Sequence, residues 1–311
     1  MTKGDEWPQI AVVGAGAVGG YFGGMLAHAG APVVMIGRQS FVGAIKQKGL
    51  VLDRPQARER INVEATVEMS AVRDARLILF CVKSIDTSLA ATEMAPFLAQ
   101  DATVVSLQNG VDNVDRIREA ASISALSAAV YVAVSVPEPG HVKHLARGDV
   151  IVGPPSEQTK YVADIFNRAG IHCQISNNIE GELWAKLLCN CALNAISALG
   201  QARYGQIAES SDARQVMQNV VEEVLAVARA AKVILPNIAN TKAGMAAAME
   251  IATQMAGALS STAQDINRGR PTEIDSLNGY VSRRGAELGV SVPVNHALFT
   301  LVKLAEQRLL M

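Results

Sequence analysis

Residues 9–19 read Gln-Ile-Ala-Val-Val-Gly-Ala-Gly-Ala-Val-Gly, which is a short apolar strand followed at once by a glycine-rich turn. The pattern continues as a helix over 20–29 and, after Gly30, as a second strand over 32–36. A GxGxxG loop between a strand and a helix is the context in which such a loop binds a dinucleotide. We therefore interpret this segment as a cofactor-binding motif; the alternative is merely a tight turn between strand and helix.

Each glycine of the loop has a separate expected role. Gly14 permits the tight turn, Gly16 lets the pyrophosphate approach the backbone, and Gly19 lets the helix pack closely on the strand. The phosphates would then rest on the helix N-terminus, where free N–H groups and the helix dipole favour negative charge. The expected cofactor-binding residues of the loop are Gly14, Ala15, Gly16, Ala17, Val18 and Gly19.

The end of the second strand indicates which nicotinamide cofactor binds. An NAD enzyme usually carries Asp or Glu there, to bind the 2′-hydroxyl of the ribose. Residues 37–40 read Gly-Arg-Gln-Ser and contain no acid. Because Arg38 can pair with a 2′-phosphate, we expect NADPH/NADP; the alternative is an exposed surface arginine.

Two later strands end in polar residues. The apolar run 77–82 has the composition of a strand buried on both faces and is followed by Lys83, and the run 103–107 is followed by Gln-Asn109-Gly. Ligands of open parallel sheets lie beyond the carboxyl ends of the strands. Lys83 and Asn109 are therefore expected to contact the cofactor; the alternatives are a solvated lysine and a turn-forming Asn-Gly pair.

The remaining pattern divides the chain in two. Residues 125–152 suggest an antiparallel pair of strands with its turn at 137–140, and a helix over 157–169 and a strand over 171–175 follow. After residue 180 only helical patterns remain, over 180–199, 216–231, 240–267, 272–288 and from Pro293 to about Leu309. We therefore predict an α/β Rossmann-type N-terminal domain that binds NADP (1–177) and an all-α C-terminal domain for substrate and catalysis (178–311).

The helix predicted over 180–199 has an unusual polar stripe. Glu182, Lys186, Asn190 and Asn194 are each four residues apart, so that successive side chains are rotated by only roughly 40°. Most other positions are apolar, which is typical of a buried helix. Because an unpaired buried polar group costs several kcal/mol, the stripe needs partners, and a polar small molecule would supply them. The alternative is an ordinary amphipathic helix with Lys186 in solvent.

Composition excludes several other classes of protein. The chain has 311 residues, is 50% hydrophobic and carries a net charge of −1, which suits two domains with sizeable cores. Neutral charge and 4% aromatic residues argue against a nucleic-acid partner. Residues 1–8 carry charges without an apolar run, and we find no membrane-spanning stretch of roughly 20 apolar residues. The four cysteines do not suggest a disulfide framework and no metal-ligand spacing is found, so we expect a reduced, cytoplasmic protein without a metal.

Over essentially its whole length the sequence resembles the ketopantoate reductase family (2-dehydropantoate 2-reductase). The resemblance rests on the loop at 14–19, Val82-Lys83, Gln108-Asn109-Gly110, the Lys-x3-Asn-x3-Asn helix at 186–194, Ser260–Asp265 and Thr272–Gly279. The helix, followed far downstream by the last two segments, is much more specific than the glycine loop. The resemblance implies an NADPH-dependent reductase of a 2-keto acid with a Rossmann domain and a helical domain.

The resemblance also implies roles by position. Lys186 would be the general acid, and Glu273 would lie near nicotinamide and substrate as a second catalytic residue. The remaining implied contacts are Asn190, Asn194 and Ser261, with Lys186, for the substrate, and Arg38, Lys83, Asn109 and Glu273 for the cofactor. Two positions depart from the family pattern: Tyr204 stands where many members have asparagine, and Asp86 stands where some have glutamine.

The proposed chemistry is consistent with these residue types. Hydride transfer to a ketone produces an alkoxide, which needs a proton donor and a fixed electrostatic partner. Burial would lower the pKa of Lys186, whereas a neighbouring Glu273 would raise it. Asn190 and Asn194 can donate hydrogen bonds to a carboxylate or hydroxyl without adding charge.

We therefore expect reduction of 2-dehydropantoate (ketopantoate) to (R)-pantoate in pantothenate and coenzyme A biosynthesis, by an NADP-dependent oxidoreductase acting on the CH–OH group. One alternative is a reductase of the same fold that acts on a different 2-keto acid, because Tyr204 changes the expected substrate wall. The other is a non-enzymatic NADP(H)-binding sensor, which would not need Lys186 and Glu273 together. The expected partner is a small-molecule 2-keto acid, with no nucleic acid or membrane, and the sequence allows for a homodimer.

Overall fold

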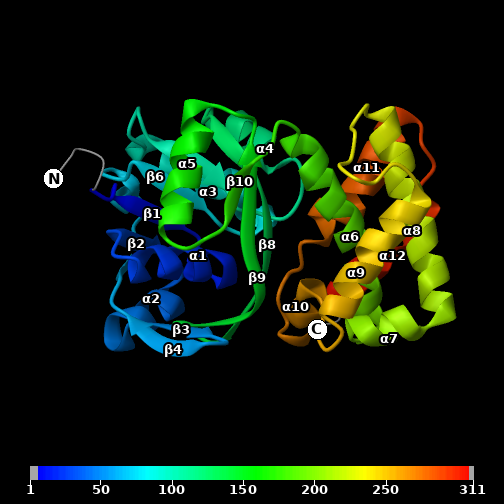
Figure 1. Cartoon of the computed structure of the whole chain (residues 1–311), viewed down its shortest axis with the longest axis horizontal. Coiled ribbons are helices and arrows are strands. Elements are labelled where there is room, and N and C mark those ends of the chain that lie inside the picture. The colour runs from blue at the N-terminus through cyan, green and yellow to red at the C-terminus, as the bar shows by residue number, and fades with distance from the viewer. Residues whose placement is uncertain (1–5, 308–311) are drawn as a thin grey trace. The chain divides into compact units, whose positions relative to one another are not determined.

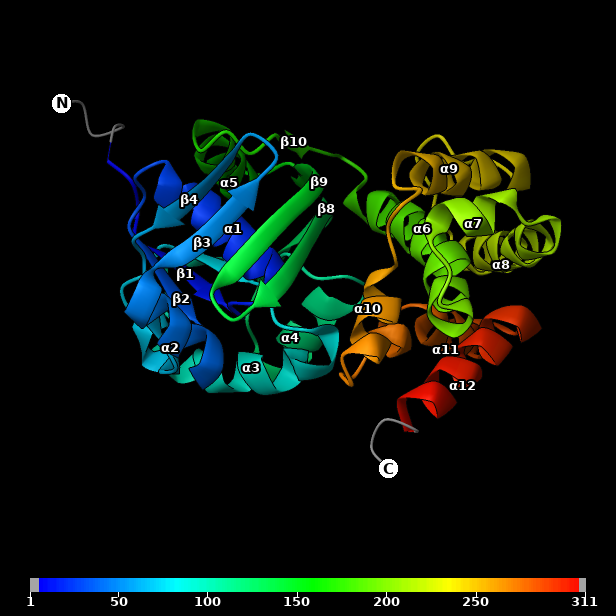
Figure 2. The ribbon, with the colours of Figure 1, turned by 90° about the horizontal axis from the view of Figure 1, so that it is seen from below.

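The structure is a computed structural model that describes residues 6–307. The chain divides into two compact units, one with the residues up to Gln108 and Asp112–Ile179, the other with Asn109–Val111 and the residues from Glu180 onward. Within the described residues, all strands belong to the first unit and the second contains only helices (Figures 1 and 2). This confirms the predicted pairing of an α/β Rossmann-type domain with an all-α domain. Residues 1–5 and the predicted helix end near Leu309 lie outside the described residues.

The first unit is built on one mixed, ten-stranded sheet in the order β4-β3-β9-β8-β7-β6-β1-β2-β5, with β10 paired to β9. Its strands are β1 (Ile10–Val13), β2 (Val33–Ile36), β3 (Leu50–Arg54), β4 (Ala57–Ile61), β5 (Glu64–Thr66), β6 (Leu77–Phe80), β7 (Thr103–Ser106), β8 (Ala125–Glu138), β9 (His141–Gly153) and β10 (Cys173–Ile175). β1 pairs in parallel with both β2 and β6, and β7 extends the parallel set beyond β6. The predicted antiparallel pair is confirmed as β8 and β9, which turn at Gly140 with φ +76°.

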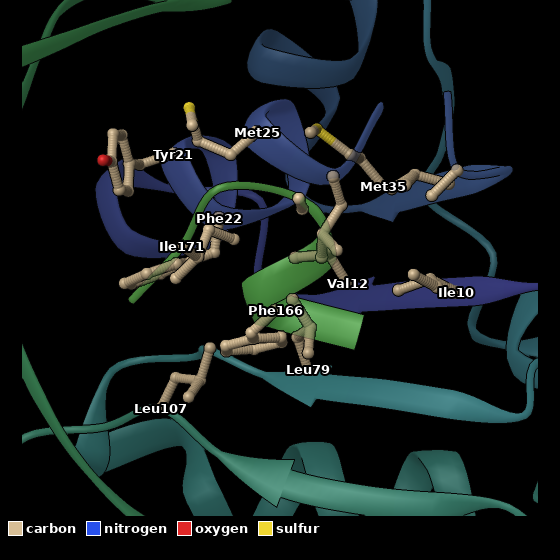
Figure 3. Close-up of a cluster of buried hydrophobic side chains, with 14 of the residues drawn as sticks. Ile10, Val12, Tyr21, Phe22, Met25, Met35, Leu79, Leu107, Phe166 and Ile171 are labelled. Carbon is tan, nitrogen blue, oxygen red and sulfur yellow. The ribbon is translucent and has the colours of Figure 1, made fainter. Parts of the chain in front are cut away.

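Successive residues of the central strands face opposite sides of the sheet, and both sides are buried. Ile10 and Val12 of β1 belong to one apolar cluster and Ala11 and Val13 to another. Figure 3 shows the first cluster, in which Phe166 packs beside β1 and β6. Burial on both faces explains why these strands are continuous apolar runs rather than alternating ones.

Helices pack on both faces of the sheet. The helices of this unit are α1 (Ala17–His28), α2 (Gln39–Lys48), α3 (Thr87–Met94), α4 (Asn113–Ala121) and α5 (Glu157–Arg168), with short 3-10 turns η1 (Met69–Val72), η2 (Ser84–Asp86) and η3 (Ala95–Phe97). Phe22 of α1 stacks on Phe166 of α5 with ring centroids 6.1 Å apart. On the other face Met94 of α3 and Ile117 of α4 are fully buried.

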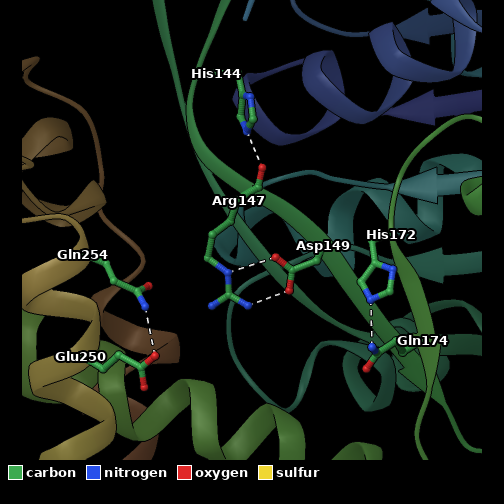
Figure 4. Close-up of polar contacts among 7 residues, drawn as sticks. All are labelled: His144, Arg147, Asp149, His172, Gln174, Glu250 and Gln254. Carbon is green, nitrogen blue, oxygen red and sulfur yellow. Dashed lines mark hydrogen bonds and ion pairs between the residues drawn. The ribbon is translucent and has the colours of Figure 1, made fainter. Parts of the chain in front are cut away.

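The β8–β9 pair is irregular where polar residues meet at its surface. The register shifts between Tyr131 and Val132, and opposite them Arg147 adopts φ +59°. Its guanidinium donates to both oxygens of Asp149, at 3.0 and 2.6 Å, and His144 contacts its carbonyl oxygen (Figure 4). The register leaves Gly148 as the extra residue of a β-bulge, and these contacts hold the neighbouring Arg147 in its left-handed conformation.

The second unit is a group of helices around one central helix. They are α6 (Ile179–Gly200), α7 (Tyr204–Glu209), α8 (Ser211–Ala230), α9 (Thr241–Gln254), α10 (Ser261–Asn267), η4 (Ile274–Ser276), α11 (Asn278–Leu288) and α12 (Pro293–Gln307). The prediction of one continuous helix over 240–267 was wrong. The side chain of Ser260 accepts a hydrogen bond from the N–H of Ala263 and starts a new helix, α10. The predicted helix over 272–288 begins only at Asn278, and Gly289 ends it in the left-handed conformation.

The central helix confirms the prediction for 180–199. Trp184, Leu187, Leu188 and Cys191 of α6 are at most 2% exposed. By length and composition α6 could cross a membrane, contrary to our expectation that no stretch of the chain would, but 61% of its most apolar window is buried inside the protein. Its apolar character therefore reflects its place in the core of the second unit.

Candidate active site

The glycine loop of the first unit has the geometry that the three glycines predict. Gly14 adopts φ +99°, and a Cβ there would lie 2.5 Å from the nitrogen of Val82. A Cβ on Gly19 would lie 2.4 Å from the carbonyl oxygen of Gly14, so only glycine allows α1 to pack this closely. By contrast, a Cβ on Gly16 would meet nothing within 4 Å. Space therefore remains in front of Gly16, where a pyrophosphate has to approach.

The N-terminus of α1 offers hydrogen-bond donors beside that space. The first helical bond runs from the N–H of Gly20 to the oxygen of Gly16, so the N–H groups of 17–19 have no helical acceptor. Gly16 provides no side-chain cap, and the first turn contains no acidic residue. Uncapped N–H groups and the positive end of the dipole suit the phosphates of a dinucleotide, so the residues present fit this group.

The end of β2 lies directly against the loop. The N–H groups of Gly14 and Ala15 both donate to the oxygen of Ile36 at 2.9 Å. Arg38 follows as the N-cap residue of α2, with its side chain 83% exposed. Its guanidinium lies 3.5 Å from the carboxylate of Asp86. The residue expected to bind a 2′-phosphate therefore also faces a carboxylate.

A buried polar network supports the ends of β6 and β7. Gln108 is 5% exposed, and its Nε2 donates to the carbonyl oxygen of Val82 at 3.0 Å and to Oγ1 of Thr87 at 2.7 Å. Its Oε1 accepts from Ser106 at 2.9 Å. The network fixes the segment Val82-Lys83, with Lys83 at the N-cap of η2. The sequence pattern alone suggests no role for Gln108, although a polar residue directly after the buried run 103–107 marks the position.

In the second unit, three of the expected residues form one hydrogen-bonded chain. Nζ of Lys186 donates to Oδ1 of Asn109 at 2.8 Å. Nδ2 of the same asparagine donates to Oε2 of Glu273 at 3.0 Å. Lys186 and Glu273 are both partly buried, so that an ammonium and a carboxylate are connected through a single amide.

The other residues of the expected substrate site lie in different surroundings. Asn190 is partly buried one turn beyond Lys186 on α6, whereas Asn194 is only 3% exposed. Oδ1 of Asn194 accepts a hydrogen bond from the hydroxyl of Tyr204 at 3.0 Å. Ser261 is exposed as the first residue of α10. The structure thus brings together Lys186, Asn109 and Glu273 by direct hydrogen bonds, but gives no such contact between them and Ser261.

The cysteines and acidic side chains do not form a metal centre in the described part of the chain. No group of three or more His, Cys, Asp or Glu residues there could hold a metal ion. All four cysteines are free. Burial raises the pKa of the Cys173 and Cys189 thiols to about 12, and the pKa values of Cys81 and Cys191 are also raised by burial. These thiols are therefore poor nucleophiles.

Comparisons with known proteins cover both units. The family model described as "Ketopantoate reductase PanE/ApbA" matches residues 10–157, and the model of its C-terminal part matches residues 178–306. The 2-dehydropantoate 2-reductase of Pyrococcus horikoshii is 32% identical over 303 residues, covering 96% of this chain and 97% of the relative. That of Pyrococcus abyssi is 33% identical over 300 residues, covering 95% and 97%.

Solved structures agree with this result. A PanE/ApbA family ketopantoate reductase from Ralstonia eutropha JMP134 is 46% identical, with a TM-score of 0.91, and covers 97% of this chain and 100% of its own. A ternary structure of D-mandelate dehydrogenase with NADH and anilino(oxo)acetate is 25% identical, with a TM-score of 0.90 and coverage of 97% and 99%. The chain therefore belongs to the ketopantoate reductase family and is an oxidoreductase that acts on a CH–OH group with a nicotinamide cofactor.

Proposed function

We propose that this protein is a cytoplasmic reductase that converts 2-dehydropantoate to (R)-pantoate with NADPH, in pantothenate and coenzyme A biosynthesis. The observation that carries the proposal is the chain of hydrogen bonds from Lys186 through Asn109 to Glu273. It supports the proposal because the hydrogen bond to Asn109, itself held by Glu273, fixes the orientation of the Lys186 ammonium.

Lys186 is the proton donor in this proposal. Bound NADPH supplies the hydride for the keto carbon, and the negative charge then develops on the former carbonyl oxygen. The ammonium of Lys186 stabilises that oxygen and gives it a proton, which leaves a neutral amine. Asn109 keeps the amine in place through its Oδ1, while Glu273 accepts a hydrogen bond from Nδ2 of the same amide and so fixes the orientation of Asn109.

The cofactor assignment rests on the first unit. The glycine loop and the uncapped N-terminus of α1 would hold the pyrophosphate, and Lys83 would contact the cofactor from the end of β6. We assign the 2′-phosphate to Arg38, whose exposed guanidinium follows β2. Asp86 opposes this preference, because its carboxylate at 3.5 Å repels a phosphate on Arg38.

The substrate assignment rests on the polar stripe of α6. We propose that Asn190 and Asn194 donate hydrogen bonds to the keto acid and that Ser261 binds its carboxylate. These groups add no charge, so that the ammonium of Lys186 remains the cation of the site. We also predict a homodimer, which sedimentation of the purified protein would test.

A second candidate is a reductase of the same fold for another 2-keto acid. The observation in its favour is the likeness to D-mandelate dehydrogenase, together with Tyr204 at a position where many family members have asparagine. A non-enzymatic sensor is supported less well, because binding of a nicotinamide cofactor alone would not need the contacts between Lys186, Asn109 and Glu273.

A panel of 2-keto acids tests the proposal. NADPH and NADH oxidation is followed by absorbance with 2-dehydropantoate, pyruvate and phenylglyoxylate, and the chirality of the product is determined. We expect the highest kcat/KM with 2-dehydropantoate and NADPH, by at least about tenfold. A higher value with another keto acid would establish the second candidate. Tight NADPH binding without turnover of any keto acid would favour the sensor.

A further inference from the structure

Tyr204 makes a specific polar contact inside the core of the second unit. It is the first residue of α7, and its side chain lies among the apolar residues around α6, with 7% exposure. Its hydroxyl donates to Oδ1 of Asn194 at 3.0 Å. Burial raises the pKa of Tyr204 well above its ordinary value, so that the hydroxyl keeps its proton and remains a donor.

The other half of the Asn194 carboxamide has no partner of this kind. No acceptor among the described residues bonds to Nδ2, although the residue is only 3% exposed. Nδ2 of Asn194 is not fully enclosed, so it still borders accessible space. The donor therefore suits an acceptor that comes from outside the chain.

The backbone around this contact is well fixed. The hydroxyl of Ser260 donates to the carbonyl oxygen of Asn194 at 3.1 Å, and the N–H of Ser260 donates to Oγ of Ser197 at 3.1 Å. The N–H of Tyr204 donates to the carbonyl oxygen of Ala258 at 3.0 Å. The start of α7 is thus tied to the segment before α10, and that segment to α6, so the tyrosine hydroxyl has a defined position relative to Asn194.

We propose that Tyr204 is a positioning residue that fixes the orientation of the Asn194 carboxamide. The Nδ2 of Asn194 then binds an oxygen of the substrate that accepts hydrogen bonds. This inference rests on the proposed function. A carboxamide can turn over and present either its oxygen or its nitrogen. With Oδ1 held by Tyr204, Asn194 presents only N–H donors, and a carboxylate oxygen of a 2-keto acid is a strong acceptor for them.

Tyr204→Phe tests the inference because it removes the hydroxyl and keeps the ring in the core. Loss of one orienting hydrogen bond should raise KM for the keto acid about fivefold to tenfold. It should leave kcat within about twofold, and KM for the nicotinamide cofactor unchanged. Tyr161→Phe is the matched control, since it removes a tyrosine hydroxyl from the first unit and should change neither constant.

A double mutant separates positioning from packing. Asn194→Ala should raise KM for the keto acid, and Tyr204→Phe combined with Asn194→Ala should raise it no further, because the tyrosine acts through the asparagine. Independent, multiplying effects would overturn the inference, as would an unchanged KM in Tyr204→Phe. Melting temperatures are measured for each variant.

Asn194→Asp keeps the test decisive if the phenylalanine variant does not fold. One carboxylate oxygen would take the tyrosine hydrogen bond, and the other would face the substrate carboxylate, so KM should rise at least about tenfold at pH 8. An unchanged KM would refute the inference. Assays of the wild-type protein distinguish failure of the proposed function from failure of the inference about Tyr204. If the wild type turns over no keto acid, the proposed function is refuted, and the inference with it. If the wild type turns over a keto acid and the variants have the same KM for it, only the role of Tyr204 is refuted.

Discussion

Replacement of Lys186 by alanine tests the proposed proton donor most directly. Loss of a positioned general acid lowers kcat by roughly 10²–10⁴, which corresponds to about 2.7–5.4 kcal/mol of transition-state stabilisation. The change also removes the 2.8 Å charge-assisted hydrogen bond to Asn109, a contact of a class that contributes about 1.5–3 kcal/mol to stability. Because a folded protein has about 5–15 kcal/mol of stability, Lys186→Ala should still fold.

The assay is the pH–rate profile of kcat, followed by absorbance of NADPH, for wild type and Lys186→Ala. Since only the protonated amine can donate, wild type should lose activity at high pH, and the variant should lack this high-pH limb. NADPH binding should be nearly unchanged, because the glycine loop belongs to the first unit. Lys242→Ala is the control, since it removes an exposed lysine of the same unit and should leave kcat within about twofold.

Two further results bear on the role of the ammonium. Lys186→Arg should not restore activity, because the guanidinium stays protonated at working pH and is a poor proton donor. Partial recovery of Lys186→Ala by an added small amine would support proton transfer over simple charge. The reasoning is refuted if Lys186→Ala keeps the high-pH limb of wild type with kcat within a factor of a few.

Three other outcomes are expected. Arg38→Ala should raise KM for NADPH about tenfold and leave KM for NADH nearly unchanged; an unaltered ratio of kcat/KM for the two cofactors would exclude Arg38 as the 2′-phosphate ligand. Asp86→Asn should increase the preference for NADPH over NADH, because it removes the carboxylate that lies 3.5 Å from Arg38. The effect should be only about twofold to fivefold, because the ion pair is largely exposed, and a decreased preference would contradict the geometry. Because burial raises the pKa of Cys173 and Cys189 to about 12, only about one thiol in 10⁴ is ionised at pH 8, so a thiol reagent should label the native protein slowly and all four cysteines after unfolding. Above a pH of about 9 the unfolded state releases the thiol protons, whereas the folded state keeps them. The melting temperature should therefore fall as pH rises from about 9 towards 12, and a constant melting temperature would contradict the pKa shifts.

Local patterns accounted for much of the fold. The strand, glycine loop and helix were predictable because Gly14 takes the positive φ of a tight turn and a side chain on Gly19 would collide with the carbonyl oxygen of Gly14. The long helix expected over 240–267 failed for a local reason as well. Its alanine and methionine content favours a helix, but the cap at Ser260 competes with continuation, and the side chain satisfies the N–H of Ala263.

The candidate site was predictable only in part. Helix geometry alone puts Lys186, Asn190 and Asn194 on one stripe, but it does not say which of them is enclosed. The resemblance to a family suggested roles for Asn109 and Glu273 without their mutual contact. Asp86 and Tyr204 stand out in the sequence only as departures from the family pattern, and neither their partners nor the network around Gln108 follows from that pattern.

The sequence by itself determined the two kinds of domain and suggested the residues to which we assign their chemistry, because periodicity, glycine conformation and helix capping act over a few neighbouring residues. Tertiary structure alone decided that Asn109 joins Lys186 to Glu273, which lies 164 positions after Asn109 in the chain. It also decided that the hydroxyl of Tyr204 donates to Oδ1 of Asn194. Hydrogen bonds between distant segments depend on how whole elements pack, since a shift of about 1 Å makes or breaks them.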